Sequence, residues 1–128
     1  MRALLDTHTF LWWNLDAPRL SQTSRDLLGD GDNELLLSVV SVWEIAIKHA
    51  RGRLDLPKPP AEYLPERIAH YGYDALRVEV GHALQAGRLP AHHSDPFDRL
   101  LIAQALVERL PILSADPHFA RYGVEVIW

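Results

Sequence analysis

The sequence has no cysteine among its 128 residues. The protein can therefore form no disulfide, and it has neither a thiolate metal site nor a cysteine nucleophile. No apolar stretch approaches the roughly 18 residues that a membrane span requires. Asp6 interrupts the apolar N-terminus, and no small-residue cleavage site follows it. We therefore expect a soluble, unprocessed, cytoplasmic protein.

Positive charge is also scarce, because 13 Lys and Arg face 17 Asp and Glu and the net charge is −4. This balance argues against sequence-independent nucleic-acid binding through bulk positive charge. Lysine is rare, with two residues against 11 arginines. The planar guanidinium of Arg suits phosphate, so the bias leaves a phosphate-bearing partner open. A GC-rich coding sequence explains the same bias equally well.

What is present is an ordinary globular composition, 48% hydrophobic and 23% charged, without repeats or low-complexity segments. The length fits one domain, and we expect residues 1–128 to form it. Apolar runs and turn residues predict strands that alternate with helices. Strands are expected at residues 4–5, 34–38, 75–80, 111–114 and 124–127, and helices at residues 7–14, 21–29, 39–51, 61–70, 81–86 and 96–106, with another from 117. This alternation predicts a mostly parallel α/β sheet with helices on both faces.

Four acids stand where such a sheet keeps its ligand site. Asp6 directly follows the first strand, and Asp98 and Asp116 lie at the starts of helices. Glu44 lies in the apolar helix that follows the second strand. The carboxyl ends of parallel strands and the beginnings of the helices after them share one edge of the sheet. We therefore expect the four carboxylates to lie together.

Each acid also has a purely structural interpretation. Asp6 could cap the helix that follows it, and Asp98 could be a first-turn acid that faces the helix dipole. Glu44 could form a capping box with Ser41 or an ion pair with Lys48. Four such coincidences at one edge are less probable than any one of them, which favours a common site.

Crowded carboxylates repel each other and resist ionisation unless a cation compensates them. Oxygen ligands without Cys suit Mg²⁺ or Mn²⁺ rather than Zn²⁺, and the adjacent His92 and His93 have no chelating spacing and are expected at the surface. A carboxylate-held Mg²⁺ suits phosphodiester hydrolysis, because it polarises the phosphoryl oxygen and makes hydroxide from water. Without these four acids, 13 of the 17 acidic residues remain and balance the 13 basic residues. The net charge of −4 therefore equals the charge of the proposed site.

These residues resemble the PIN-domain ribonucleases, and more narrowly the toxin of VapBC-type toxin–antitoxin pairs. The matching segments run through the chain in order: Leu4-Leu5-Asp6-Thr7-His8, Ser38-Val39-Val40-Ser41-Val42-Trp43-Glu44-Ile45, Asp98-Arg99-Leu100-Leu101-Ile102-Ala103-Gln104-Ala105, and Ile112-Leu113-Ser114-Ala115-Asp116 with His118-Phe119. The resemblance implies a three-layer fold whose five-stranded sheet has the order 3-2-1-4-5. It also implies a metal-dependent endoribonuclease that uses Mg²⁺, for which Mn²⁺ may substitute.

The resemblance further implies that Asp6, Glu44, Asp98 and Asp116 are the catalytic, metal-binding acids. Ser114 would occupy the small hydroxyl position before the fourth acid. Asp95 is an additional nearby acid that either binds metal or only caps its helix.

The expected partners are an RNA substrate, a second copy of the chain and a cognate antitoxin. Five aromatic residues exceed what a small core hides and point the same way: Trp12, Trp13, Trp43, Tyr63 and Tyr71. The antitoxin segment is expected in an apolar groove near the active site, with an Arg placed among the acids.

Other classes of protein fit less well. A receiver domain would need paired acids after the first strand and a Lys after the fifth, but Thr7 follows Asp6 and both lysines precede residue 60. A phosphatase with an aspartyl nucleophile would need a second acid where His8 stands. The alternative that stays open is a non-catalytic PIN-like or receiver-like module that binds magnesium.

Overall fold

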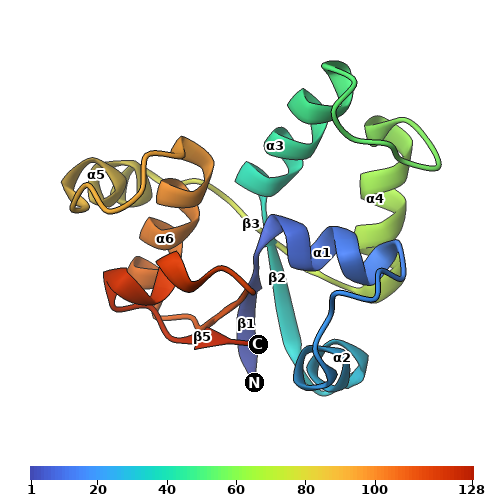
Figure 1. The fold of residues 1–128 in the computed structure, drawn as a ribbon, viewed down its shortest axis with the longest axis horizontal. Helices are drawn as coiled ribbons and strands as arrows, with labels where there is room; N and C mark the ends of the chain where they lie inside the picture. The colour runs from blue at the N-terminus through green and yellow to red at the C-terminus, as the bar shows by residue number, and fades with distance from the viewer.

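The computed structural model describes residues 1–128 and contains one five-stranded sheet, with β1 at its centre (Figure 1). The strands are β1 (Arg2–Leu5), β2 (Glu34–Ser38), β3 (Asp74–Leu76), β4 (Ile112–Leu113) and β5 (Val126–Ile127). Their order is β3-β2-β1-β4-β5, and every neighbouring pair is parallel. The predicted fold class and strand order are confirmed.

Helices cover both faces of the sheet. They are α1 (Thr7–Asn14), α2 (Gln22–Gly29), α3 (Val39–Ala50), α4 (Pro60–Tyr71), α5 (Val80–Arg88), α6 (Pro96–Glu108) and the 3₁₀ helix η1 (Pro117–Tyr122). Helices α1, α2 and α4 lie on one side, and α5, α6 and η1 on the other (Figure 1). Helix α3 packs into both layers, through Ile45 on the first side and Val40 on the second. None of these helices is long and apolar enough to cross a membrane.

Strand β1 is apolar on both of its faces. Ala3 and Leu5 pack into the core beneath α1, α2 and α4, whereas Leu4 packs into the core beneath α6 and η1. All three side chains are at most 1% exposed. A central strand of a parallel sheet needs this composition because helices cover it on both sides. The packing holds the carboxyl end of β1, and therefore Asp6, in a fixed position.

The starts of α6 and α3 show whether Asp95 caps its helix and whether a capping box explains Glu44. Asp95 caps α6, because its carboxylate accepts hydrogen bonds from two backbone N–H groups in the first turn. Helix α3 begins after Ser38, whose hydroxyl accepts from the N–H of Val40. Ser41 therefore lies inside the helix rather than at its start, and the capping box that would explain Glu44 is absent.

The segment around α5 differs from the prediction. The third strand was expected at residues 75–80 but pairs with β2 only over Asp74–Leu76. Helix α5 begins at residue 80, where the ring Nδ1 of His82 accepts from the backbone N–H of Glu79. It also continues through Gly87, which was expected to end it. The strand ends at Leu76, and residues 77–79 separate it from the helix.

We predict that Leu5→Ala lowers the free energy of unfolding by about 2–5 kcal/mol, because truncating a fully buried side chain leaves a cavity. Val107→Ala on α6, where the side chain is 45% exposed, is the control and should change stability by at most about 0.5 kcal/mol. Urea unfolding of both variants measures the difference. Equal midpoints would contradict the central position of β1.

Candidate active site

Three of the four predicted acids line one open hollow at the carboxyl edge of the sheet. Asp6 lies at the junction of β1 and α1, Asp98 in the first turn of α6, and Asp116 at the N-cap of η1. The hollow has a volume of about 470 Å³. Parallel strands bring these residues together because their carboxyl ends meet at one edge.

Glu44 lies deeper than the other acids and does not line the hollow. It is 2% exposed, and its Oε1 accepts a hydrogen bond from the Thr7 hydroxyl at 2.8 Å. Its Oε2 forms the predicted ion pair with Lys48. The structure therefore places Glu44 behind Asp6, close enough for its charge to act on Asp6 and Asp98.

Ser114 connects two of the acids in the hollow. Its buried hydroxyl donates to Asp6 Oδ2 at 3.0 Å and accepts from the backbone N–H of Asp116 at 3.0 Å. The Asp6 side chain does not cap α1, although the residue occupies the N-cap position. The capping interpretation of Asp6 is therefore wrong for its carboxylate, which points to Ser114 instead.

Burial makes two of the acids reluctant to ionise. Desolvation, reinforced by repulsion from Glu44 and Asp116, raises the pKa of Asp6 to about 6 despite the Ser114 hydrogen bond. Desolvation also raises the pKa of Asp98 to about 6, with repulsion from neighbouring acids acting in the same direction. A bound cation would remove this penalty because it favours the ionised carboxylates.

Asp116 behaves in the opposite way. Burial opposes ionisation, but hydrogen bonds from the backbone N–H and the ring of His118 hold the pKa of Asp116 below its usual value. Asp116 also caps η1 through that backbone hydrogen bond. Its carboxylate is therefore ionised at neutral pH without help from a cation.

The sequence analysis expected His93 at the surface and did not include it in the site, but His93 lines the hollow. Its Nε2 is 2.7 Å from Asp98 Oδ2, and its ring stacks on His118 with the centroids 5.2 Å apart. Potential ligand atoms of His93, Asp98 and Asp116 all lie within 4.8 Å of one another. His92, by contrast, is exposed as predicted.

Arg99 holds the loop that carries His93 in place. Its guanidinium donates to four backbone carbonyls in the segment that precedes α6, those of Ala86, Leu89, Pro90 and His93. These bonds fold the segment back against the first turn of α6, which carries Asp98. A sequence pattern does not reveal this contact, because His93 lies in an irregular loop rather than at helical spacing.

The donor set fits a divalent metal ion. Neighbouring ligands of an octahedral ion at about 2.1 Å lie about 3 Å apart, so small movements would bring His93, Asp98 and Asp116 around one ion, whereas Asp6 lines the same hollow outside this closest group. Two of these carboxylates pay an electrostatic cost that a cation would relieve. Carboxylates suit Mg²⁺ and Mn²⁺, and an imidazole nitrogen is a better ligand for transition metals than for Mg²⁺.

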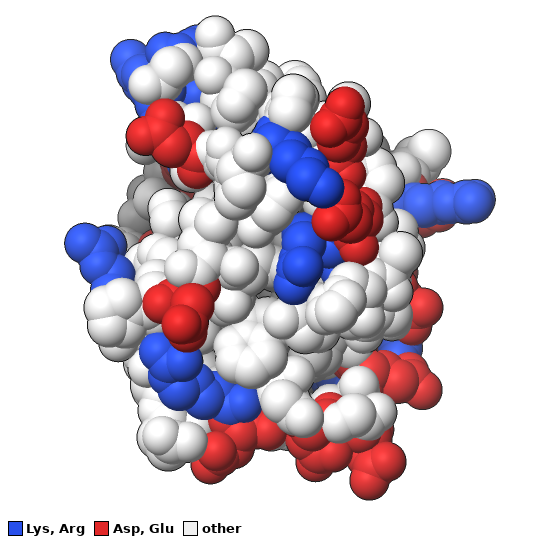
Figure 2. Space-filling model, turned by 90° about the vertical axis from the view of Figure 1, so that its right-hand side faces the viewer, with Lys and Arg blue, Asp and Glu red and all other residues white.

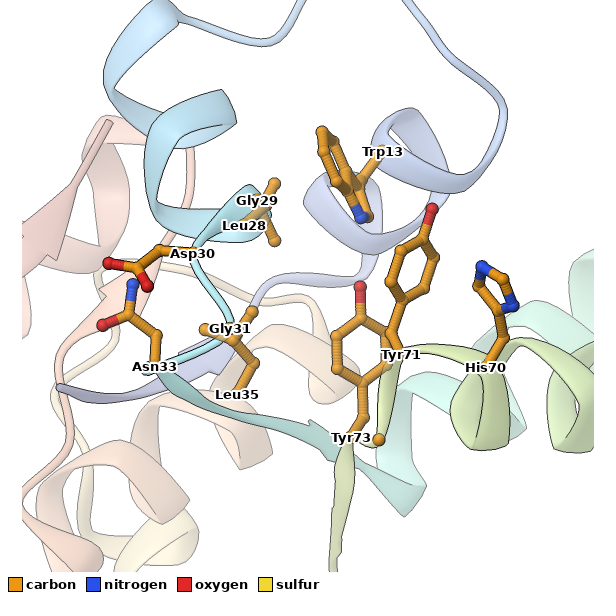
Figure 3. Close-up of a pocket in the computed structure, with 11 residues that line it drawn as sticks. Trp13, Leu28, Gly29, Asp30, Gly31, Asn33, Leu35, His70, Tyr71 and Tyr73 are labelled. Carbon is orange, nitrogen blue, oxygen red and sulfur yellow. The ribbon is translucent and has the colours of Figure 1, made fainter.

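A second hollow, of about 320 Å³, lies at the opposite edge of the sheet, where β2 and β3 begin. Figure 3 shows Trp13, Tyr71 and Tyr73 gathered on one side of it, with Asp30 and Asn33 on the other. It has one carboxylate, and it lies at the edge of the sheet opposite to Asp6, Asp98 and Asp116. This hollow therefore does not have the donors of a metal centre.

Residues 3–125 match the PIN domain family, and the chain belongs to that family. This finding agrees with the strand order and with the acids at the carboxyl edge. The resemblance recognised from the sequence is therefore confirmed.

Two similar proteins are both named ribonuclease VapC. Ribonuclease VapC16 of Mycobacterium tuberculosis is 39% identical over 69 residues, which are 51% of this chain and 49% of that protein. The match thus spans about half the length of that relative. Ribonuclease VapC22 of the same organism is 29% identical over 114 residues, covering 88% of this chain and 85% of that protein.

Solved structures share the fold at low sequence identity. VapBC2 from Rickettsia felis, bound to promoter DNA, superposes with a TM-score of 0.75 at 14% identity, covering 100% of this chain and 99% of that one. FitAcB from Neisseria gonorrhoeae has a TM-score of 0.69 at 20% identity, covering 100% and 97%.

We predict that the metal-free protein loses stability as the pH rises from 5 to 7.5. The folded pKa values of Asp6 and Asp98, about 6, exceed the ordinary value of 3.8, so the folded state retains protons that the unfolded chain has released. The stabilisation is full below pH 4 and is lost as the pH rises through 6. Between pH 5 and 7.5 the loss is about 1 kcal/mol for Asp6 and less for the partly exposed Asp98.

Urea unfolding in chelator at the two pH values measures this effect. Asp6→Asn is the control, because removing this titrating group should reduce the dependence to the smaller contribution of Asp98. Saturating Mg²⁺ should also remove it, since the bound ion keeps both carboxylates ionised. If the stability of Asp6→Asn falls with pH as steeply as that of the wild type, Asp6 is not the source of the pH dependence.

Proposed function

We propose that the protein is a metal-dependent endoribonuclease that hydrolyses RNA phosphodiester bonds. The observation that carries this proposal is the convergence of Asp6, Asp98 and Asp116 in one hollow, where two of them have raised pKa values. The relatives named ribonucleases support RNA as the substrate.

Asp6, Asp98 and Asp116 would hold the ion through their carboxylates, with His93 as an additional nitrogen donor. Bound Mg²⁺, or Mn²⁺ in its place, supplies Lewis-acid activation of the phosphoryl oxygen and a hydroxide nucleophile. Ser114 orients Asp6 by donating to its Oδ2.

Glu44 belongs to the same proposed site, because its charge repels Asp6 and Asp98 and so increases the demand for a cation. Its hydrogen bond from Thr7 and its ion pair with Lys48 fix it in place. Truncating Glu44 would remove a buried charge that repels Asp6 and Asp98.

We further propose that residues 1–128 act as one PIN domain, as the cytoplasmic toxin of a type II toxin–antitoxin pair. A largely apolar hollow of about 330 Å³ adjoins the acids, since it shares His8 and Trp12 with their hollow. Leu11, Leu15 and Leu54 line it, and Lys48 and Arg53 also border it. It fits the apolar groove expected for an antitoxin segment. An Arg of that segment would replace the charge of the metal among the acids.

Exposed aromatic surface supports a homodimer. Of the five aromatic residues considered in the sequence, Tyr63 is buried at 5% exposure, whereas Trp43 is 60% exposed. Trp43 packs edge-on against Phe97, with the ring centroids 5.3 Å apart, beside the exposed Val39. Such an apolar surface is suited to pairing with a second copy of the chain.

We predict that the protein cleaves single-stranded RNA with Mg²⁺ or Mn²⁺ and loses this activity in chelator. Asp98→Asn should lower cleavage by about two orders of magnitude or more, since no other ligand takes its position. Its stability in chelator should hold or rise, because one repelling charge is gone. The metal-induced rise in melting temperature should shrink.

Asp32→Asn, in an exposed loop, is the matched control and should leave both readouts unchanged. Undiminished cleavage in chelator would overturn the metal mechanism. An Asp98→Asn protein that melts lower in chelator yet keeps its metal response would show that Asp98 only supports the helix.

We also predict that the protein is a dimer by light scattering and is inhibited by a small protein encoded beside it. Leu15→Arg should abolish that inhibition without reducing cleavage, because it places a charge in the apolar hollow. Val107→Arg, exposed on α6, is the control and should remain inhibited. A monomer with no inhibitory neighbour would contradict both parts.

A further inference from the structure

One wall of the acidic hollow contains groups that the metal chemistry does not use. Trp12 of α1 and Arg19, in the segment between α1 and α2, both line it beside the acids. The Arg19 guanidinium carbon lies 5.6 Å from the centroid of the Trp12 ring. An aromatic ring and a cation therefore stand together at the edge of the proposed reaction centre.

The Trp12 ring is held in place by its neighbours. Trp128 meets it edge-on with the centroids 5.8 Å apart, and His8, one helical turn earlier, lies at 5.7 Å. The ring is nevertheless only half-buried. A ring that is already ordered loses little conformational freedom when a ligand packs against it.

Arg19 is exposed, and its guanidinium contacts the Trp12 ring without a hydrogen bond or ion pair to another residue, although three acids line the same hollow. Its contact with Trp12 leaves the guanidinium N–H groups available. A guanidinium in this situation matches the phosphate oxygens of a nucleic acid.

We propose that Trp12 and Arg19 bind the nucleotide next to the scissile phosphate: an unpaired base packs against the Trp12–Arg19 pair, and Arg19 contacts the adjacent phosphate. The proposal rests on the proposed ribonuclease function and describes how that site holds its RNA. Single-stranded RNA is the ligand, because a base must leave its own stack to pack on a protein ring.

The charge distribution favours such a local contact over a broad basic surface. The net charge is −4, and Figure 2 shows basic and acidic side chains interspersed over the face in view. Non-specific attraction of RNA to such a surface is weak. Stacking and one well-placed cation are therefore the more effective source of affinity.

The test measures binding of a short, fluorescein-labelled single-stranded RNA in chelator, where no cleavage occurs. Trp12→Ala should weaken binding about tenfold, and Trp12→Phe should retain most of it, because stacking needs an aromatic face. Arg19→Ala should weaken binding and reduce the slope of log K against log salt by about 0.7, the value for one phosphate contact on a single strand.

Two variants outside the hollow are matched controls. Tyr71→Ala removes an exposed aromatic ring at the opposite edge of the sheet and Arg88→Ala an exposed arginine, and both should bind RNA like the wild type. With metal present, the Trp12 and Arg19 variants should raise KM more than they lower kcat. Their metal-induced rise in melting temperature should match the wild type, which separates RNA binding from damage to the metal site.

Normal RNA binding by both Trp12→Ala and Arg19→Ala, with wild-type protein that cleaves RNA, would overturn this inference and leave the ribonuclease function intact. The inference would also be overturned if the Trp12 and Arg19 variants lost antitoxin binding but kept RNA binding, because Trp12 and Arg19 would then bind a protein partner. Wild-type protein that binds RNA but cleaves none with Mg²⁺ or Mn²⁺ would refute the ribonuclease function and leave the binding site standing. If Trp12→Ala does not fold, the affinity and the salt slope of Arg19→Ala decide the question.

Discussion

The burial of the Asp6 carboxylate at the end of the central strand is the constraint on which the site depends. A carboxylate that is 4% exposed resists ionisation, and Glu44 and Asp116 add repulsion. The apolar strand β1 holds it there because both faces of that strand are packed, so the chain cannot relax to bring Asp6 to water. The hydrogen bond from Ser114 offsets only part of this cost.

This electrostatic cost and the proposed chemistry have the same origin. A cluster of carboxylates that repel each other binds a cation strongly because the ion removes the repulsion, and natural sites commonly sacrifice stability for function in this way. Arg99 extends the arrangement, since its four bonds to backbone carbonyls bring His93 next to Asp98. The loop before α6 thereby becomes part of the site.

Helix α1 joins the proposed metal site to the proposed RNA contact. It begins directly after Asp6, and its first residue, Thr7, donates a hydrogen bond to Glu44. His8 and Trp12 are four residues apart and therefore share one face of the helix, which turns toward the hollow. A helix of eight residues thus links the proposed metal-binding acids to the proposed stacking surface.

The sequence by itself determined the elements and the edge at which the acids meet. Apolar runs locate β1 and β2, capping residues locate α6, and strand ends place Asp6, because all of these depend on neighbours in the chain. Packing between distant segments decided the rest. Glu44 lies behind Asp6, where Thr7 of α1 donates a hydrogen bond to it, and β3 pairs with β2 over only three residues. His93 joins the acids through Arg99, a contact between segments that no local pattern encodes.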